Sequence, residues 1–109
     1  MIVTNENITS KQRSKLKGIA STMAPIAQIG KGGVTENMVN SLSEALEARE
    51  LIKISVLKNC ADDPKELAAV LAERTHSEVV QVIGKKIVLY KESKNKKKIE
   101  LPKQYEYYI

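Results

Sequence analysis

The sequence predicts an α+β fold in which a mixed four-stranded sheet packs with helices in two layers. Helical and strand-like apolar periodicities alternate along the 109 residues, and only Gly84 and Lys85 separate the last two strand-like segments. Alternating helices and strands favour parallel neighbours, whereas a hairpin is antiparallel, so the sheet is expected to be mixed. The expected element order is αβαβαββ. A chain of this length forms one domain with a modest core.

The first predicted helix covers residues 10–23 and is apolar on one face. Thr9 or Ser10 would cap its start, and Pro25 would end it. The apolar positions follow helical spacing and are Leu16, Ile19, Ala20 and Met23. Much of the remaining surface is cationic and consists of Lys11, Arg13, Lys15 and Lys17. Because no acidic residue interrupts this cationic surface, we favour partner binding over simple solvation for it.

A short strand at 26–29 and a second helix at 35–49, with Thr35 as its N-cap, enclose a glycine loop. The loop consists of Gly30, Lys31, Gly32 and Gly33. Glycine permits positive φ and close approach of another backbone, the lysine supplies a cation, and the helix start offers unpaired N–H groups. The loop therefore has two interpretations: a site for an anion such as phosphate, or a turn that merely needs glycine.

The remaining elements complete the sheet. Residues 51–58 alternate as a half-buried strand, and Asp63 begins a third helix that is expected to run to residue 75. Strands 79–83 and 86–90 then form a hairpin, for which glycine at the first turn position suits a type II′ turn. The core-facing residues of the half-buried strand are expected to be Ile52, Ile54 and Val56.

Residues 9–92 form the predicted domain, and residues 1–8 form a loose leader. The C-terminal tail, 93–109, is rich in lysine and is expected to be mobile. Whether its apolar residues dock on the domain stays open. The lysines that would add attraction for a polyanion are Lys94, Lys96, Lys97 and Lys98.

Composition excludes several classes of function. The single cysteine, Cys60, supplies neither a disulfide framework nor a zinc ligand set, and the single histidine, His76, sits at a predicted helix end. A P-loop would need glycine where Pro25 stands and a hydroxyl side chain where Gly32 stands. No apolar stretch approaches the length of a membrane span. We expect a cytoplasmic, non-catalytic protein without metal, cofactor, small-molecule substrate or membrane partner.

The charge distribution favours a polyanionic partner. The formal net charge is +5, and basic residues gather towards both ends of the chain, on either side of a net acidic segment at 36–78. The chain lacks Phe and Trp, so a stacking platform for unpaired bases is not expected. Recognition of a folded RNA through its backbone and shape fits better. Charge alone leaves DNA open, but no helix-turn-helix, zinc-finger or zipper pattern is present.

Several sequence blocks occur together in the order found in a known family. They are TSKQR at 9–13, QIGKGGVT at 28–35, ALEARELIK at 45–53, VQVIG at 80–84 and VLY at 88–90. Across roughly residues 9–92 the chain resembles the CRM domain (chloroplast RNA splicing and ribosome maturation), specifically the small bacterial YhbY-like proteins. The resemblance implies a fold similar to the C-terminal domain of bacterial translation initiation factor 3, RNA binding, and association with precursors of the large ribosomal subunit.

The resemblance also implies which residues contact RNA. They are the G-x-x-G loop with the nearby basic surface: Gly30, Lys31, Gly32, Gly33, Thr35, Lys11, Arg13, Lys15 and Lys17. Relatives often carry a basic residue just before Pro25, where this chain has Met23 and Ala24, and a glycine where His76 stands. The alternative is a protein–protein adaptor that docks on a ribosomal protein or another acidic partner. The RNA hypothesis requires that the loop is exposed and does not press against carboxylates.

Overall fold

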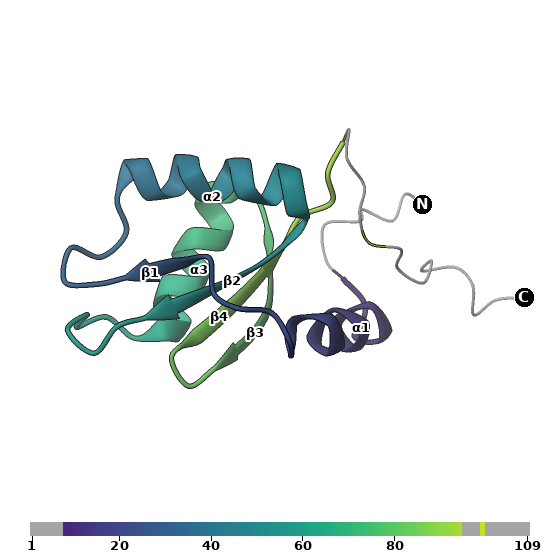
Figure 1. Cartoon of the computed structure of the whole chain (residues 1–109), viewed down its shortest axis with the longest axis horizontal. Helices are drawn as coiled ribbons and strands as arrows, with labels where there is room; N and C mark the ends of the chain where they lie inside the picture. The colour runs from purple at the N-terminus through teal and green to yellow at the C-terminus, as the bar shows by residue number, and fades with distance from the viewer. Residues whose placement is uncertain (1–7, 95–98, 100–109) are drawn as a thin grey trace, which may run out of the picture.

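A computed structural model describes residues 8–94 and residue 99. Its elements are α1 (Ser10–Ala20), β1 (Ala27–Ile29), α2 (Glu36–Arg49), β2 (Leu51–Val56), α3 (Pro64–Thr75), β3 (Glu78–Ile83) and β4 (Lys86–Tyr90). The strands form one sheet in the order β1-β2-β4-β3, in which β1 is parallel to β2 and the other neighbours are antiparallel (Figure 1). The predicted α+β class, element order and mixed sheet are confirmed.

Two helices, α2 and α3, cover one face of the sheet (Figure 1). Because side chains alternate across a strand, every second residue of β2 and β4 points into this layer. The predicted core residues of β2 are confirmed, since Ile52 and Ile54 are fully buried and Val56 nearly so. They pack with Ile87 and Leu89 of β4 and with leucines of both helices. Burial of each such side chain contributes about 1.5–3 kcal/mol.

The first helix lies on the opposite face of the sheet. Its buried residues, Leu16 and Ala20, pack in a separate cluster with Leu51, Val80, Val88 and Tyr90. The two expected layers are therefore the sheet with α2 and α3, and α1 adds cover on the second face. Ile19, which was expected on the apolar side of α1, is 36% exposed. The first helix therefore covers only part of this second face and leaves residues of β2, β3 and β4 open.

Local sequence signals set the helix starts. Thr9 caps α1 in a capping box with Gln12, and Thr35 and Asp63 cap the other two helices as predicted. The end of α1 differs from the prediction, because the helix stops at Ala20 rather than at residue 23. The Ser21 hydroxyl donates to the Gly18 carbonyl at 2.7 Å, so a side chain competes for a terminal helix carbonyl before Pro25 is reached.

A buried carboxylate joins the end of α2 to the segment after β4. Glu50 has a positive φ of 68° and is fully buried. Its Oε2 accepts a hydrogen bond from the Ser93 N–H at 2.7 Å, and its Oε1 accepts one from the Ile99 N–H at 2.8 Å. Ser93, which was placed in a mobile tail, is thus buried in the domain. Residues 95–98 and 100–109 lie outside the described residues, as do residues 1–7 of the expected leader.

Candidate nucleic-acid interface

The glycine loop connects β1 to α2 at one end of the sheet. It is closed by a hydrogen bond of 3.0 Å from the Gly33 N–H to the Gly30 carbonyl. Gly33 has a φ of 68°, which an L-residue adopts only with strain, so glycine is favoured at this position. Lys31 and Gly32 are exposed, and a Cβ on Gly32 would meet nothing within 4 Å. A ligand can therefore reach the tip of the loop.

The loop that follows β2 lies beside the glycine loop. A Cβ on Gly30 would be 3.5 Å from the Oδ1 of Asn59 and from a methyl group of Leu57. A Cβ on Gly33 would be 3.6 Å from the Oδ2 of Asp62. The requirement for exposure is thus met at Lys31 and Gly32, whereas one carboxylate does lie next to Gly33. Asp62 is itself exposed, so water screens its charge.

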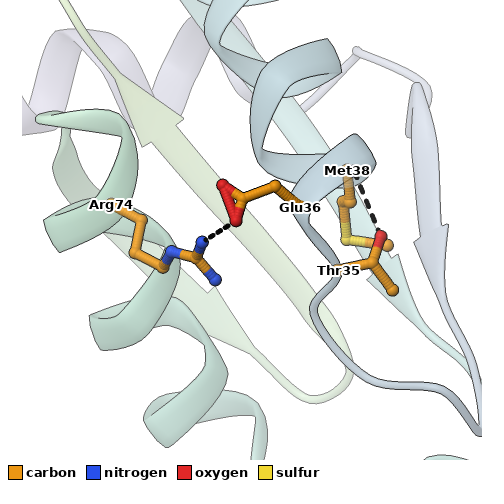
Figure 2. A network of polar contacts seen from close by, with 4 residues as sticks. All are labelled: Thr35, Glu36, Met38 and Arg74. Atoms are coloured by element: carbon orange, nitrogen blue, oxygen red, sulfur yellow. Dashed lines mark hydrogen bonds and ion pairs between the residues drawn. The ribbon is translucent and has the colours of Figure 1, made fainter.

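The start of α2 is fixed by Thr35, a residue that the family resemblance implied as an RNA contact. The Thr35 hydroxyl accepts a hydrogen bond from the Met38 N–H at 3.2 Å, so this oxygen serves as the helix cap. Next to it, Glu36 forms an ion pair of 2.8 Å with Arg74 of α3 (Figure 2). Both side chains are partly or largely exposed, so the pair contributes little to stability. The ion pair does place the positive charge of Arg74 beside Glu36, the acidic residue in the first turn of α2.

The four cationic residues of α1 do not adjoin the glycine loop. In Figure 1 the loop between β1 and α2 lies at the left end of the domain, and α1 lies towards the right. Lys11, Lys15 and Lys17 are exposed, but Arg13 is half-buried. Its guanidinium donates to the carbonyls of Val79 and, at 2.9 Å, of Val80. The structure thus gives Arg13 a role in holding α1 to the edge strand β3.

Sequence reasoning missed several lysines that the fold brings to the loop end of the sheet. Because β4 is antiparallel to β2, the turn at Gly84 and Lys85 lies where β2 ends, and the Val56 N–H bonds to the Lys85 carbonyl at 2.7 Å. Lys58 is exposed in the loop after β2. The pairing of Ser55 with Lys86 brings a further lysine to the same end. Strand register, which the hairpin prediction already contained, is the signal that could have found them.

The described residues offer little for catalysis. No group of three or more His, Cys, Asp or Glu among them is placed to hold a metal ion. Cys60 is buried in the core, and Asp63 caps α3.

Burial, with smaller effects from the charges of Glu50 and Glu92, raises the pKa of Tyr90 to about 12, so its phenol is neutral at physiological pH. No helix in the described part of the chain is both long and apolar enough to cross a membrane.

Comparison with known proteins gives a consistent result. A model of the CRS1 / YhbY (CRM) domain matches residues 8–91. A Bacillus subtilis protein named as a probable RNA-binding protein, YqeI, is 54% identical over 95 residues, which cover 87% of this chain and 99% of that protein. A Haemophilus influenzae protein named as an RNA-binding protein is 32% identical over 97 residues, covering 89% and 97% respectively. The solution structure of a Staphylococcus aureus protein, itself proposed to bind RNA, is similar with a TM-score of 0.75 and 55% identity, covering 88% of this chain and 100% of the other.

Proposed function

Since this chain belongs to the CRS1 / YhbY (CRM) domain family, we propose that it is a non-catalytic RNA-binding protein that contacts the RNA backbone through its glycine loop. The observation that carries the proposal is the exposed tip of that loop, with Lys31 and Gly32, at the end of the sheet that also carries the exposed lysines Lys58 and Lys85. Ammonium groups attract phosphates, and glycine lets the RNA backbone approach closely. Arg13 contributes indirectly by holding α1 in place.

We further propose that the RNA is ribosomal, in the form of large-subunit precursors, and that the protein assists their assembly in the cytoplasm. The support is the resemblance to the YhbY-like proteins together with a surface suited to a folded, phosphate-rich partner. The lysines after β4 would add attraction that does not depend on base sequence and would speed encounter. Among them, Lys94 is described and exposed, while Lys96, Lys97 and Lys98 lie outside the described residues.

A Gly32→Asp variant tests the role of the loop directly. A side chain at this position meets no neighbour, so the fold should be retained, while the added carboxylate repels phosphate. We expect RNA binding to be lost, in an electrophoretic mobility-shift assay, without change in the circular dichroism spectrum. Gly32→Ala is the matched control: it adds a methyl group without a charge, so it should keep the fold and weaken binding much less than Gly32→Asp does. Unchanged binding by Gly32→Asp, or loss of folding, would favour the interpretation of the loop as a structural turn.

The second candidate is a protein–protein adaptor that uses the same basic surface. The carboxylate of Asp62 beside Gly33 would repel a phosphate at that point, whereas a protein partner could place a basic side chain there. Treating a cell extract with ribonuclease before affinity purification separates the two. An association carried by RNA should dissolve, and one carried by protein should persist. Sequencing of RNA crosslinked to the protein in cells would then identify the ribosomal segment that is bound.

A further inference from the structure

The face of the sheet that α1 covers only in part carries basic residues at its open end. On this face Lys53 of β2 is paired with Val88 of β4, which is paired in turn with Gln81 of β3. The next row towards the glycine loop consists of Ser55, Lys86 and Ile83. Leu16 and Ala20 of α1 pack with Leu51, Val80 and Tyr90 and reach only Val88 of these two rows. The open rows therefore lie between α1 and the end of the sheet that carries the glycine loop.

These open rows form a groove with a volume of about 310 Å³. Three lysines from different elements line it: Lys17 of α1, Lys53 of β2 and Lys86 of β4. Ala20 and Val88, both buried, form an apolar floor, and Ile83 at the rim is 60% exposed. The lining contains no acidic residue, and no ion pair within the described part of the chain engages any of the three lysines. Lys86 Nζ donates only a long hydrogen bond of 3.3 Å to the Ser55 hydroxyl.

A β-bulge brings Gln81 into the groove. The pairing of β3 with β4 shifts between Val79, opposite Leu89, and Gln81, opposite Val88, so that Val80 is the extra residue. Val80 packs under α1, and Gln81 lines the groove on the same face. Arg13 donates to the carbonyls of Val79 and of the bulged Val80, which stabilises the bulge. The groove is thus formed by three strands and α1, and Arg13 joins α1 to the bulge.

We propose that this groove is a second RNA contact, which holds one unpaired nucleotide of a strand that continues from the glycine loop. The three ammonium groups match the charge of the phosphates, and the apolar floor accepts the sugar and base without requiring an aromatic side chain. The volume lies at the lower end of the range of small-molecule sites and suits a single nucleotide. The groove lies between α1 and the glycine loop, so it joins two basic regions that are otherwise separate. This inference rests on the proposed RNA-binding function.

The test compares two fluorescently labelled probes, an RNA hairpin and the same hairpin with a single-stranded extension of about eight nucleotides. The unaltered protein should bind the extended probe more tightly, because the extension can enter the groove. A Lys53→Gln/Lys86→Gln variant should lose that gain while still binding the plain hairpin. For the extended probe, its slope of log affinity against log salt should fall by roughly 1.4, at about 0.7 per phosphate contact of a single strand.

The matched control is Arg49→Gln/Lys65→Gln, which removes the same charge from exposed positions of α2 and α3 on the other face. It should keep the gain. As a measurement free of mutation, NMR signals of the Gln81 and Ile83 amides should shift with the extended probe and not with the plain hairpin. Equal affinity for both probes, or a gain retained by the groove variant, overturns the groove and leaves the loop proposal standing. Binding of neither probe by the unaltered protein overturns both.

Discussion

The Asp62 carboxylate lies beside Gly33, with its Oδ2 3.6 Å from the position that a Cβ on this glycine would occupy. Asp62 precedes Asp63, the N-cap of α3, but serves no capping role itself. An RNA phosphate held at the glycine loop would therefore meet one negative charge among several positive ones. The attraction of the loop for phosphate is therefore expected to be weaker than the loop sequence alone implies.

We predict that Asp62→Asn increases the affinity for RNA. Removal of one exposed charge near a phosphate changes the binding free energy by about 1 kcal/mol or less, which corresponds to a gain of roughly two- to five-fold. Fluorescence anisotropy at low salt would measure it, since the gain should shrink as salt increases. Glu73→Gln, in an exposed position of α3, is the control and should have no effect. Equal or weaker binding by Asp62→Asn would show that RNA does not approach this side of the loop.

The glycines of the loop should respond differently to alanine. Gly33 has a φ of 68°, so Gly33→Ala should lower the free energy of unfolding by about 1–2 kcal/mol. Gly32 has open space at its Cβ position and no positive φ, so Gly32→Ala should change it by about 0.5 kcal/mol or less. Urea titration followed by circular dichroism gives both values. Equal costs for the two substitutions would contradict the loop geometry.

Arg13 should matter mainly for stability. Arg13→Ala removes two partly buried hydrogen bonds to the carbonyls of Val79 and Val80 and should lower the free energy of unfolding by about 1–3 kcal/mol. Lys17→Ala, at an exposed position of the same helix, should cost about 0.5 kcal/mol or less and act on RNA affinity instead. Parallel urea titrations and binding measurements compare the two. If Arg13→Ala unfolds at the same urea concentration as the unaltered protein, these contacts do not stabilise α1.

Glu50 should protect the segment after β4. Glu50→Ala removes the acceptor from the Ser93 and Ile99 N–H groups, so both amides should exchange hydrogen faster. The free energy of unfolding should also fall, by roughly 1–3 kcal/mol for each buried donor that is left unsatisfied. Glu44→Ala, in an exposed position of α2, is the control. Unchanged protection of both amides would mean that the carboxylate does not hold this segment.

The sequence was sufficient for features that depend on neighbours along the chain. Thr35 and Asp63 cap helices because their hydroxyl and carboxylate groups lie within reach of N–H groups two or three residues further on. His76 at the end of α3 adopts a left-handed φ of 57°, at the position where the family resemblance implied glycine. The order of the elements followed from periodicity and turn residues in the same way.

Features that depend on partners far away in the chain could not be predicted from the sequence. The burial of Glu50 requires the N–H groups of Ser93 and Ile99, which are more than forty residues away. No residue near Glu50 in the sequence indicates these partners. Arg13 appeared to be one of four equivalent cations until the bulge of β3 supplied its acceptors. Lys53 and Lys86 share a groove through strand register and the placement of α1, which a pattern of charges along the chain does not encode.

The most direct measurement of the central claim is the salt dependence of RNA binding by Lys31→Ala. If the glycine loop holds a phosphate, this variant should reduce the slope of log affinity against log salt by roughly one unit, and the loss should be similar for different RNA sequences. Lys65→Ala, which removes an exposed charge from α3, should leave the slope unchanged. An unchanged slope together with unchanged affinity for Lys31→Ala would contradict the claim that this loop binds RNA.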